Sequence, residues 1–323
     1  MYALLKHLSD GRFHSGEQLA TEFSCSRSAI WKTLKQVKEI PGITVDAVSG
    51  RGYRLRRPLE LLEQHRIIES LSADQAAILN DCHVMQTVES TNELAAKAVL
   101  HTGHSEAWFA EHQTGGRGRR GRAWVSSFGQ NIYFSLATKY ELPINQLSGL
   151  SIAMGAALAD LLAQHGLSGH GLKWPNDLLW GDKKIAGILL EASGETDGPA
   201  TAIIGVGINL HLDEEARQAI DQPVACLSQA GLNVDRNVLA ADLLSTTLNV
   251  CEQYQAEGLA PFLNTWRKHD LYQNTLVKLI TPSQTFEGLS QGLANDGGIC
   301  LLVDNNTKTF YAGEVSLRAK MPE

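Results

Sequence analysis

Residues 115–124, GGRGRRGRAW, combine four arginines with four glycines. Guanidinium groups are planar sets of donors that match phosphate or carboxylate oxygens, and glycines let the backbone approach a ligand closely. Two interpretations are open: a strip that binds a nucleic-acid backbone, or a loop that closes over a smaller anion. Such a loop is expected to be disordered when empty, because ordering it costs about 1–2 kcal/mol per residue. Charge-assisted hydrogen bonds to a bound anion would offset this cost and order the loop.

The glycine spacing also satisfies G-x-G-x-x-G, through Gly116, Gly118 and Gly121. The context excludes a dinucleotide-binding fold, because the residues that follow alternate as a strand, not as a helix that could bind a pyrophosphate at its N-terminus. A Walker loop is excluded because no G-K-[ST] sequence occurs. The pattern therefore favours a mobile loop whose arginines bind the ligand.

Other polar groups interrupt apolar runs elsewhere in the chain. They are Ser90–Asn92 at the start of a predicted helix, and Lys173, Asn176, Asp177 and Lys184 in a predicted hairpin. Gly205 and Gly207 remove side chains from one face of a predicted buried strand. Each feature also has an ordinary explanation as a helix cap, a turn, a solvated hairpin tip or a bulge, so none is informative alone.

The segment that precedes these groups, residues 14–40, is predicted to form two helices joined by a tight turn. Ser15 and Ser26 can cap the helices, and Ile30, Leu34 and Val37 have the spacing of a buried helical stripe. The exposed face of the second helix carries donors and cations suited to base edges and phosphates. This face consists of Arg27, Ser28, Trp31, Lys32, Lys35 and Gln36.

A glycine-tipped hairpin is predicted next, with Arg51 at its tip and Arg54, Arg56 and Arg57 behind it. Together with the helix pair it predicts a winged helix-turn-helix that binds DNA; the alternative is a small helical domain with solvated charges. A lone winged domain buries little surface, so specific binding would need a dimer. A connecting helix is expected around Leu59–Leu71.

The net charge of −7 is distributed unevenly. The first 58 residues hold ten Lys/Arg and five Asp/Glu and carry +5, so the remainder carries −12. We therefore expect only the first segment to meet a polyanion, and the acidic body to bind a small molecule.

Composition excludes several classes of protein. No apolar run is long enough for a membrane span, and the first residues do not form a signal peptide. Five scattered cysteines without C-x-x-C, and histidines without H-E-x-x-H, indicate neither a disulfide framework nor a zinc site. We expect a cytoplasmic protein with reduced thiols and no membrane contact.

The motifs ESTN, QTGGRGRRGRAW, KWPNDLLW, KKIAGIL and IIGVGINL, in this order, resemble those of bacterial biotin protein ligases. With the winged domain, the chain is similar to the bifunctional ligase and biotin operon repressor. The resemblance covers nearly the whole chain and implies an α+β, multidomain fold. Its parts are a winged helix-turn-helix (1–62), a central mixed α/β catalytic domain of the biotin/lipoate ligase type (63–271) and a C-terminal SH3-like β-barrel (272–323).

The resemblance also implies roles for individual residues. Catalysis is implied for Lys173, Asp177, Arg119 and Lys184. Biotin binding is implied for Ser90, Thr91, Asn92, Gln113, Arg117, Gly118, Arg119 and Lys184, with Gly187, Gly205 and Gly207 leaving room for the ligand. Nucleotide binding is implied for Arg119, Arg120, Arg122, Trp124, Lys173, Asn176 and Asn209, with Trp124 against the adenine. DNA binding is implied for Arg27, Ser28, Trp31, Lys32, Lys35 and Arg51. No metal ligands are identified.

The implied reaction joins biotin and ATP, with Mg²⁺, into biotinyl-5′-AMP, and then passes biotin to a lysine of the biotin carboxyl carrier protein of acetyl-CoA carboxylase. Positioning and electrostatic stabilisation suffice for this chemistry, and the loop would protect the anhydride from water. In the repressor members the adenylate favours a homodimer that binds the operator of biotin synthesis genes.

Three alternatives stay open. A lipoate or octanoate ligase shares the catalytic fold but lacks the GRGRRGR pattern. A non-enzymatic sensor-repressor would not need both Arg119 and Lys184. A ligase whose winged domain does not repress is not distinguished by sequence, because the operator is not visible in it.

Overall fold

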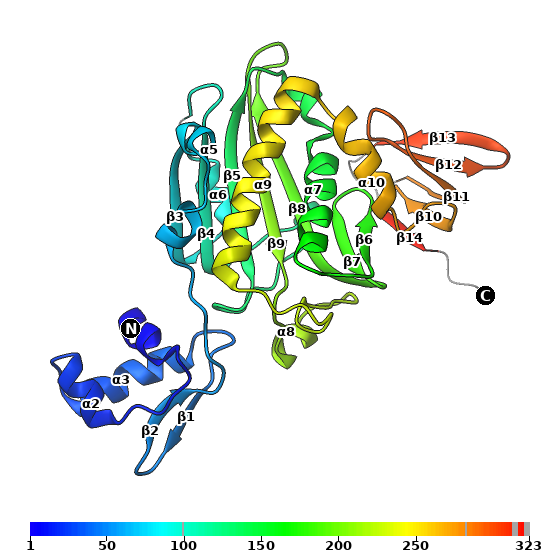
Figure 1. Ribbon diagram of the computed structural model, residues 1–323. Coiled ribbons are helices and arrows are strands. Elements are labelled where there is room, and N and C mark those ends of the chain that lie inside the picture. The colour runs from blue at the N-terminus through cyan, green and yellow to red at the C-terminus, as the bar shows by residue number, and fades with distance from the viewer. Residues whose placement is uncertain (99, 282, 312–315, 320–323) are drawn as a thin grey trace.

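The computed structural model describes residues 1–98, 100–281, 283–311 and 316–319. The chain forms a small N-terminal domain, a central sheet with helices packed on it, and a C-terminal antiparallel sheet (Figure 1). The predicted α+β, multidomain fold is confirmed.

The two helices of the N-terminal domain begin where the sequence predicts. Helix α2 (Gly16–Glu22) is capped by Ser15 in a capping box, and helix α3 (Arg27–Lys38) is capped by the Ser26 side chain. Each serine accepts a hydrogen bond from a backbone N–H that has no partner within its helix. Local polar groups therefore fix both helix starts and the turn between them.

One apolar stripe holds this domain together. The three predicted residues on α3 are buried against the first helix and the wing. The wing is an antiparallel hairpin, as predicted. The elements that complete the domain are α1 (Tyr2–Leu8), β1 (Val45–Val48) and β2 (Gly52–Leu55).

The segment after the wing differs from the predicted helix around Leu59–Leu71. Residues 58–63 contain no helix, and the backbone N–H of Leu62 donates to the Glu111 carboxylate of the central domain. A helix does form inside the predicted range, but it begins at Gln64 and ends at Ile68, because distant side chains hold the stretch before it in a non-helical conformation. The helices that form are α4 (Gln64–Ile68) and α5 (Ala73–Ile78).

The central domain is built on a seven-stranded sheet in the order β3-β4-β5-β9-β8-β7-β6. Only β3 and β4 are parallel; every other neighbouring pair is antiparallel. The strands are β3 (Leu79–Val88), β4 (Ser105–Gln113), β5 (Ile132–Tyr140), β6 (His170–Lys173), β7 (Asp177–Trp180), β8 (Lys183–Gly194) and β9 (Ala200–Ile208).

Two long helices cover one face of this sheet, in front of it in Figure 1. They are α7 (Leu150–Gln164) and α9 (Arg236–Glu257), with the shorter α10 (Leu263–His269) beside α7. Although the sequence contains no uninterrupted apolar run of that length, the stretch Ile144–Gln164 has the length and mean hydropathy needed to cross a membrane; two-thirds of its most apolar window is buried in the fold, as expected of a core helix. The other face of the sheet is left for the short helix α6 (Thr91–Ala95) and the glycine–arginine loop.

The C-terminal part is a five-stranded antiparallel sheet in the order β13-β12-β11-β10-β14. Within the described residues it is open, with β13 and β14 at its edges, so an SH3-like sheet is observed but no closed barrel. The strands are β10 (Leu276–Ile280), β11 (Thr285–Leu293), β12 (Ile299–Val303), β13 (Asn306–Phe310) and β14 (Ser316–Ala319).

A buried ion pair joins the central domain to the segment that precedes it. Arg236, at the start of α9, pairs with Glu111 near the end of β4, and both side chains are almost completely inaccessible. Arg236 also donates to the carbonyl oxygens of Glu60 and Asn131. Because the remaining donors and acceptors of the pair are used, the charges are compensated despite their burial.

The N-terminal domain also contacts the segment that follows the glycine–arginine loop. Phe128 packs into the core of the N-terminal domain, and its backbone N–H donates to Pro41. The Gln130 amide donates to Gly42 O at 2.9 Å. The chain that leaves the loop is therefore anchored on the winged domain a few residues later.

Candidate active site

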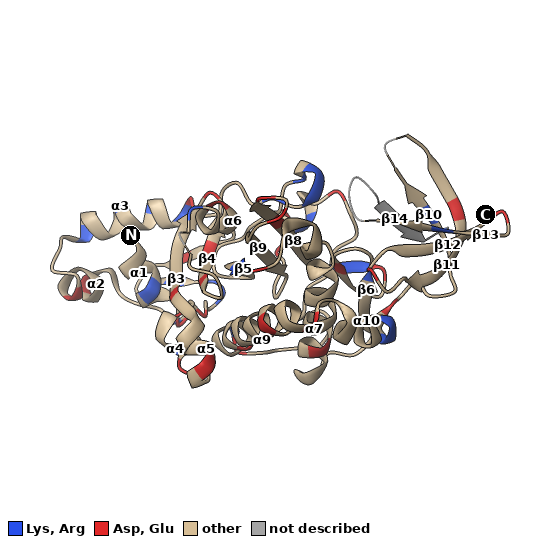
Figure 2. Cartoon of the chain, turned by 90° about the horizontal axis from the view of Figure 1, so that it is seen from above, with Lys and Arg blue, Asp and Glu red and all other residues tan. Residues whose placement is uncertain are grey.

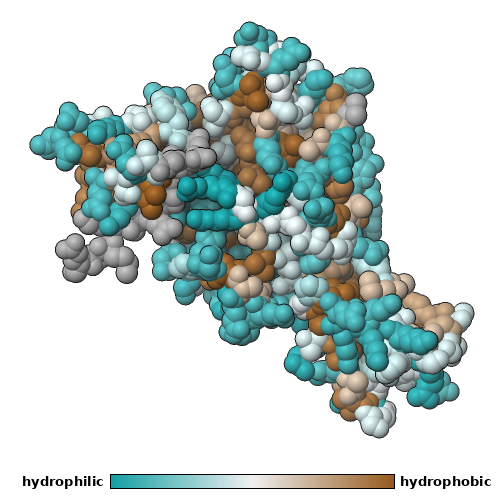
Figure 3. Space-filling model, turned by 180° about the vertical axis from the view of Figure 1, so that it is seen from behind, coloured by the Kyte–Doolittle hydropathy of each residue, from teal (hydrophilic) through white to brown (hydrophobic). Residues whose placement is uncertain are grey.

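A cavity of about 480 Å³ opens on the face of the central sheet opposite α7 and α9. Strongly hydrophilic side chains gather near the middle of the molecule seen from this side (Figure 3). The volume is that of an ordinary small-molecule site. Its walls come from the glycine–arginine loop, the β6–β7–β8 hairpins, strand β9 and the segment Asp221–Pro223.

The glycine–arginine loop is folded back on itself as a narrow turn. The N–H of Gly118 donates to Arg122 O, and the N–H of Trp124 donates to Gly116 O. Gly121 lies in the turn with φ of 70°, a conformation that L side chains rarely adopt. The turn directs several arginines toward the cavity, as the sequence predicts for a loop that covers a ligand.

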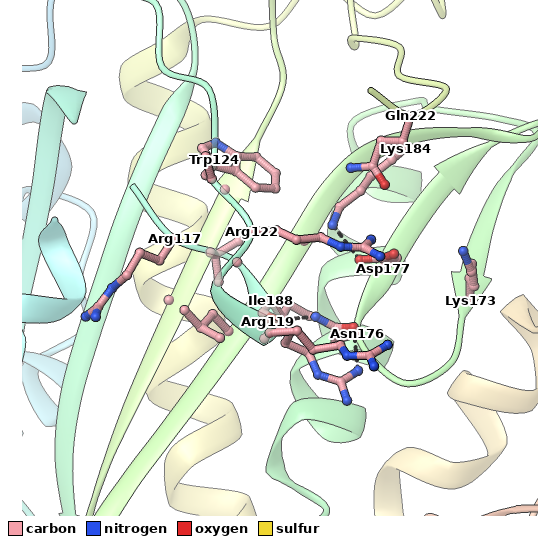
Figure 4. Close-up of a pocket in the computed structure, with 18 of the residues that line it drawn as sticks. Arg117, Arg119, Arg122, Trp124, Lys173, Asn176, Asp177, Lys184, Ile188 and Gln222 are labelled. Atoms are coloured by element: carbon pink, nitrogen blue, oxygen red, sulfur yellow. Dashed lines mark hydrogen bonds and ion pairs between the residues drawn. The ribbon is translucent and has the colours of Figure 1, made fainter. Parts of the chain in front are cut away.

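One cation of the cavity, Lys184, is held by an ion pair. Its Nζ lies 2.6 Å from Asp177 Oδ1, and the side chain is only 15% exposed. A register shift between β7 and β8 sets this position, and the Lys184 N–H donates to Pro223 O. Lys184 is therefore part of the cavity wall and not a solvated hairpin tip. Arg122 extends toward the same carboxylate (Figure 4).

A second cation, Arg119, is held beside the hairpin turn. Its Nη1 donates to Asn176 Oδ1 at 3.2 Å, and Asn176 in turn donates to Ile188 O at 2.6 Å. Burial lowers the pKa of the Arg119 guanidinium, against the charge of Asp177. Lys173 lines the same end of the cavity. These cations and amides form the end of the cavity that suits phosphate groups.

The predicted glycines face the cavity, but side chains of the protein occupy the space in front of them. A Cβ on Gly207 would collide with the ring of Trp124, and one on Gly205 would collide with Asn92. Gly187 lies against both Trp124 and Lys184. In this structure the glycines therefore admit protein side chains and not the ligand directly. Trp124 Nε1 is buried and, among the described residues, has no hydrogen-bond partner.

The other end of the cavity is a buried set of hydroxyl and amide groups. The backbone N–H of Thr91 donates to Gln113 Oε1 at 2.8 Å, and Ser135 Oγ lies 2.6 Å from Asn92 Oδ1. Ser90 precedes α6 without forming a side-chain cap. Simple helix capping therefore does not explain these residues, whose donors and acceptors suit a polar ring system.

One residue predicted at the site, Asn209, does not line the cavity. Its amide donates to Ala225 O at 3.2 Å, which ties the end of β9 to the segment that supports Lys184. A direct contact of Asn209 with a nucleotide is therefore not supported by this geometry, and its visible role is structural.

Four residues at or beside the site carry no sequence signal that predicted them. Tyr272, Asp221 and Gln222 line the cavity from segments far from the motifs, and Glu191 bonds to Asn92 from β8. These four residues reach the site only through the tertiary fold, so their local sequence gives no sign of it. A fifth residue, Ser135, could have been noticed, because it is a serine between Phe134 and Leu136 in the largely apolar strand β5.

A separate basic surface lies on the winged domain. Lys and Arg residues mark α3, whereas α2 carries acidic residues (Figure 2). Trp31 is 50% exposed, and Lys35 Nζ lies 3.8 Å from the centre of its ring. The remaining predicted residues on α3 are exposed, and they are Arg27, Ser28 and Lys32.

The wing presents fewer free cations than its sequence implies. Arg51 at the tip packs over the Phe13 ring at 4.2 Å. Arg54 and Arg56 both pair with Asp46, at 3.2 and 2.9 Å. The wing tip therefore offers Arg51, while the two arginines behind it already have a carboxylate partner.

The described residues form no metal centre by themselves. Within the described part of the chain, no three His, Cys, Asp or Glu side chains are grouped to hold an ion. All five cysteines are free thiols.

Three segments of the chain match known protein families. Residues 84–209 match the "Biotin/lipoate A/B protein ligase family", residues 1–54 match "HTH domain", and residues 276–318 match "Biotin protein ligase C terminal domain". The matches follow the order of the three structural parts.

Individual relatives extend over more of the chain. The bifunctional ligase/repressor BirA of Escherichia coli is 37% identical over 98% of this chain and 96% of its own length. A biotin–acetyl-CoA-carboxylase ligase of Mycobacterium tuberculosis is 30% identical over 72% of this chain and 86% of its own length. The biotin protein ligase of Aquifex aeolicus, solved with biotin and ATP, superposes with a TM-score of 0.63 at 26% identity, covering 75% of this chain and all of that one.

Proposed function

Because this chain belongs to the BirA family of bifunctional ligase/repressors, we propose that it has two activities. It attaches biotin to a lysine of a biotin carboxyl carrier protein in an ATP-dependent reaction, and it represses transcription of biotin synthesis genes. The observation that supports this most strongly is one cavity with a cationic end, held by Lys184 and Arg119, and a buried polar end around Asn92. A winged helix-turn-helix is docked on the same domain.

The first step forms biotinyl-5′-AMP. A biotin carboxylate oxygen bonds to the α-phosphorus of ATP, and the bond from that phosphorus to the bridging oxygen breaks, so that pyrophosphate leaves. Lys184 and Arg119 stabilise the charge that grows on the transferring group, and Lys173 and Arg122 stabilise the pyrophosphate. Asp177 holds Lys184 in place before the ligand arrives.

The second step transfers the biotinyl group. The neutral amine of the carrier lysine bonds to the acyl carbon of the adenylate, and the bond from that carbon to the phosphate oxygen breaks, so that AMP leaves and the nitrogen loses a proton to water. Asp177, at the cationic end of the cavity, orients the incoming amine. Until then the glycine–arginine loop protects the anhydride from water.

Mg²⁺ enters with ATP, as the complex that is the substrate. Mg²⁺ binds through one or two carboxylates together with substrate phosphates, so it does not need an all-protein site. Asp177, Asp182 and Asp221 line the cavity and would supply these carboxylates, although the described residues contain no preformed metal cluster.

The polar end holds the biotin ring system and the cationic end holds the nucleotide. Ser90, Thr91, Asn92 and Gln113 would bind the ureido group, and Trp124 would pack against the adenine. To do so, the Trp124 ring would leave its position over Gly207.

The proposed domain boundaries lie at residues 62 and 271. The proposed location of the protein is the cytoplasm.

Repression requires two copies of the winged domain on a two-fold operator. The adenylate-bound protein forms a homodimer, and α3 enters the major groove with Arg27, Ser28, Trp31, Lys32 and Lys35. Arg51 of each wing contacts the flanking DNA backbone. Exposure of these side chains supports the assignment.

Both activities are tested with the purified full-length protein. A biotin carboxyl carrier domain is incubated with ATP and biotin, lipoate or octanoate, and the mass of the carrier is measured. We expect one biotinyl group on one lysine, and modification by lipoate or octanoate instead would indicate the alternative ligase. Gel shifts with DNA from upstream of the biotin synthesis genes then test repression. A carrier-active protein that shifts no such DNA would be a ligase whose winged domain does not repress.

A further inference from the structure

The first arginine of the loop, Arg117, does not join the cations around Asp177. Its side chain points to the opposite side from Arg119 and Arg122 (Figure 4). Arg117 Nη2 lies 3.3 Å from Glu93 Oε1 and 4.0 Å from Glu191 Oε1. Since Glu93 belongs to α6 and Glu191 to β8, one guanidinium connects the loop to two elements of the cavity wall.

Glu191 also reaches the polar end of the cavity. Its Oε2 accepts a hydrogen bond from Asn92 Nδ2 at 2.7 Å. Asn92 is only 5% exposed, and Ser135 donates to its Oδ1 from the neighbouring strand β5. One carboxylate therefore contacts both the base of the loop and a residue proposed to bind biotin.

The ion pairs of Arg117 with Glu93 and Glu191 are exposed enough to break when the loop opens. The side chains of Arg117, Glu93 and Glu191 are 46, 33 and 40% exposed, so water and salt screen their attraction. A weak pair suits a loop that must admit ATP and later expose the adenylate to the carrier lysine. The buried pair of Glu111 and Arg236 would not open as readily.

We propose that Glu93 and Glu191 are positioning residues that hold the glycine–arginine loop closed through Arg117 and so slow the release of the adenylate. This inference rests on the proposed ligase activity. The two carboxylates act through Arg117 and not on the reacting groups. They therefore control how long the intermediate is retained, and they leave its formation almost unchanged.

The test compares the wild type with the double variant Glu93→Gln/Glu191→Gln in the full-length protein. Glutamine keeps the size of each side chain, and its carbonyl oxygen can still accept from Asn92. Biotinyl-5′-AMP is formed from labelled biotin and ATP, and its release is followed after excess unlabelled biotin is added. We expect release to be about threefold to tenfold faster than in the wild type at low salt. ATP–pyrophosphate exchange should stay within about twofold.

Two further measurements distinguish this role from a structural one. They are the salt dependence of adenylate release and the effect of the two substitutions in a protein that already carries Arg117→Gln. At about 0.5 M salt the two proteins should release the adenylate at similar rates, because screening removes the attraction in the wild type. In an Arg117→Gln background, changing the two glutamates should have no further effect on release. Glu89→Gln is the matched control, since Glu89 is an exposed carboxylate beside Gly115 without an ion pair among the described residues.

Equal release rates in the wild type and the double variant would overturn the proposal, as would an equal acceleration in the Arg117→Gln background. Thermal unfolding checks that the variants are folded. If the double variant is not folded, the release rate is measured with the single variant Glu93→Gln instead. If the wild type itself does not exchange pyrophosphate with biotin, the proposed function fails, whatever the glutamates do.

Discussion

At the scale of single residues, Arg119 is the side chain that connects the loop to the hairpin. Its guanidinium is held by Asn176, which is itself fixed to the backbone of β8. Retention of the adenylate therefore depends on this arginine more than on exposed Arg117. A charge-assisted hydrogen bond contributes about 1.5–3 kcal/mol, so losing one or two accelerates release at least tenfold.

The variant Arg119→Gly should release biotinyl-5′-AMP about 10- to 100-fold faster than the wild type. Released adenylate would then label lysines of bystander proteins, which is measured by blotting biotin in a mixture of carrier and serum albumin. A variant that retains the adenylate as the wild type does would show that the loop assignment is wrong.

The family that the motifs resemble, and not residue types and spacing alone, led to the prediction of the residues at the cationic end of the cavity. Arg119, Asn176, Asp177 and Lys184 all line it, since neighbouring positions on one hairpin and one loop meet by local geometry. Glu191 and Tyr272 were missed, because their places depend on the pairing of distant strands and on the C-terminal part. Asn209 was assigned to the nucleotide through the family resemblance, yet its side chain donates to the backbone carbonyl of Ala225.

At the scale of elements, the start of α9 is fixed by the buried pair of Arg236 and Glu111. Arg236→Met should lower the free energy of unfolding by about 3–5 kcal/mol, because it leaves the Glu111 carboxylate buried without its cation. Urea denaturation followed by tryptophan fluorescence measures this loss.

The matched control for this pair is Glu111→Leu/Arg236→Met, which removes both charges together. It should recover a large part of the stability lost in the single variant. A single variant as stable as the wild type would mean that the pair does not hold α9 in place.

The junction between α10 and the C-terminal sheet contains a carboxyl group with a shifted pKa. Burial raises the pKa of Asp270 to about 6. The folded state then binds more protons than the unfolded state between about pH 4 and 6, so stability falls as the pH rises through this window. We expect the wild type to lose about 1–3 kcal/mol across it relative to Asp270→Asn.

Thermal unfolding of both proteins at several pH values between 4 and 7 measures this difference. Asparagine keeps the oxygen that accepts from the Tyr272 N–H, so the comparison isolates the charge. Parallel curves for the two proteins would show that Asp270 titrates normally.

The elements themselves were predictable where local chemistry decides them. Ser15 and Ser26 begin α2 and α3, and the Gly50–Arg51 turn forms the wing. The stretch 58–63 was not predictable, because Glu111 and Asn237 take up its backbone N–H groups from far along the sequence. The order of the seven strands is not visible in any local pattern for the same reason.

At the scale of the whole molecule, two chain segments run from the cavity to the winged domain. One passes from Trp124 to Gln130, and the other from Asp221 back to Asp213. They meet where Gln130 contacts both Gly42 and Asp213. A ligand that orders the cavity loops would therefore also act on the position of the winged domain.

Gln130→Ala should reduce the effect of the adenylate on operator affinity. Allosteric coupling typically changes affinity about 5- to 150-fold, and the variant should lose most of that ratio while carrier biotinylation changes less than about twofold. Gel shifts with and without biotinyl-5′-AMP measure the ratio. Gln86→Ala, an exposed glutamine on β3, is the control, and an unchanged ratio in Gln130→Ala would exclude this route.

The central claim is that the cavity activates biotin as an adenylate, and ATP–pyrophosphate exchange measures this step alone. The assay is run with biotin, lipoate or octanoate as the acid, in the wild type and in Lys184→Gln. The account predicts exchange with biotin only, reduced about 100- to 1,000-fold in the variant by loss of one electrostatic donor. Exchange that requires lipoate or octanoate, or no exchange with any of the three acids, would contradict it.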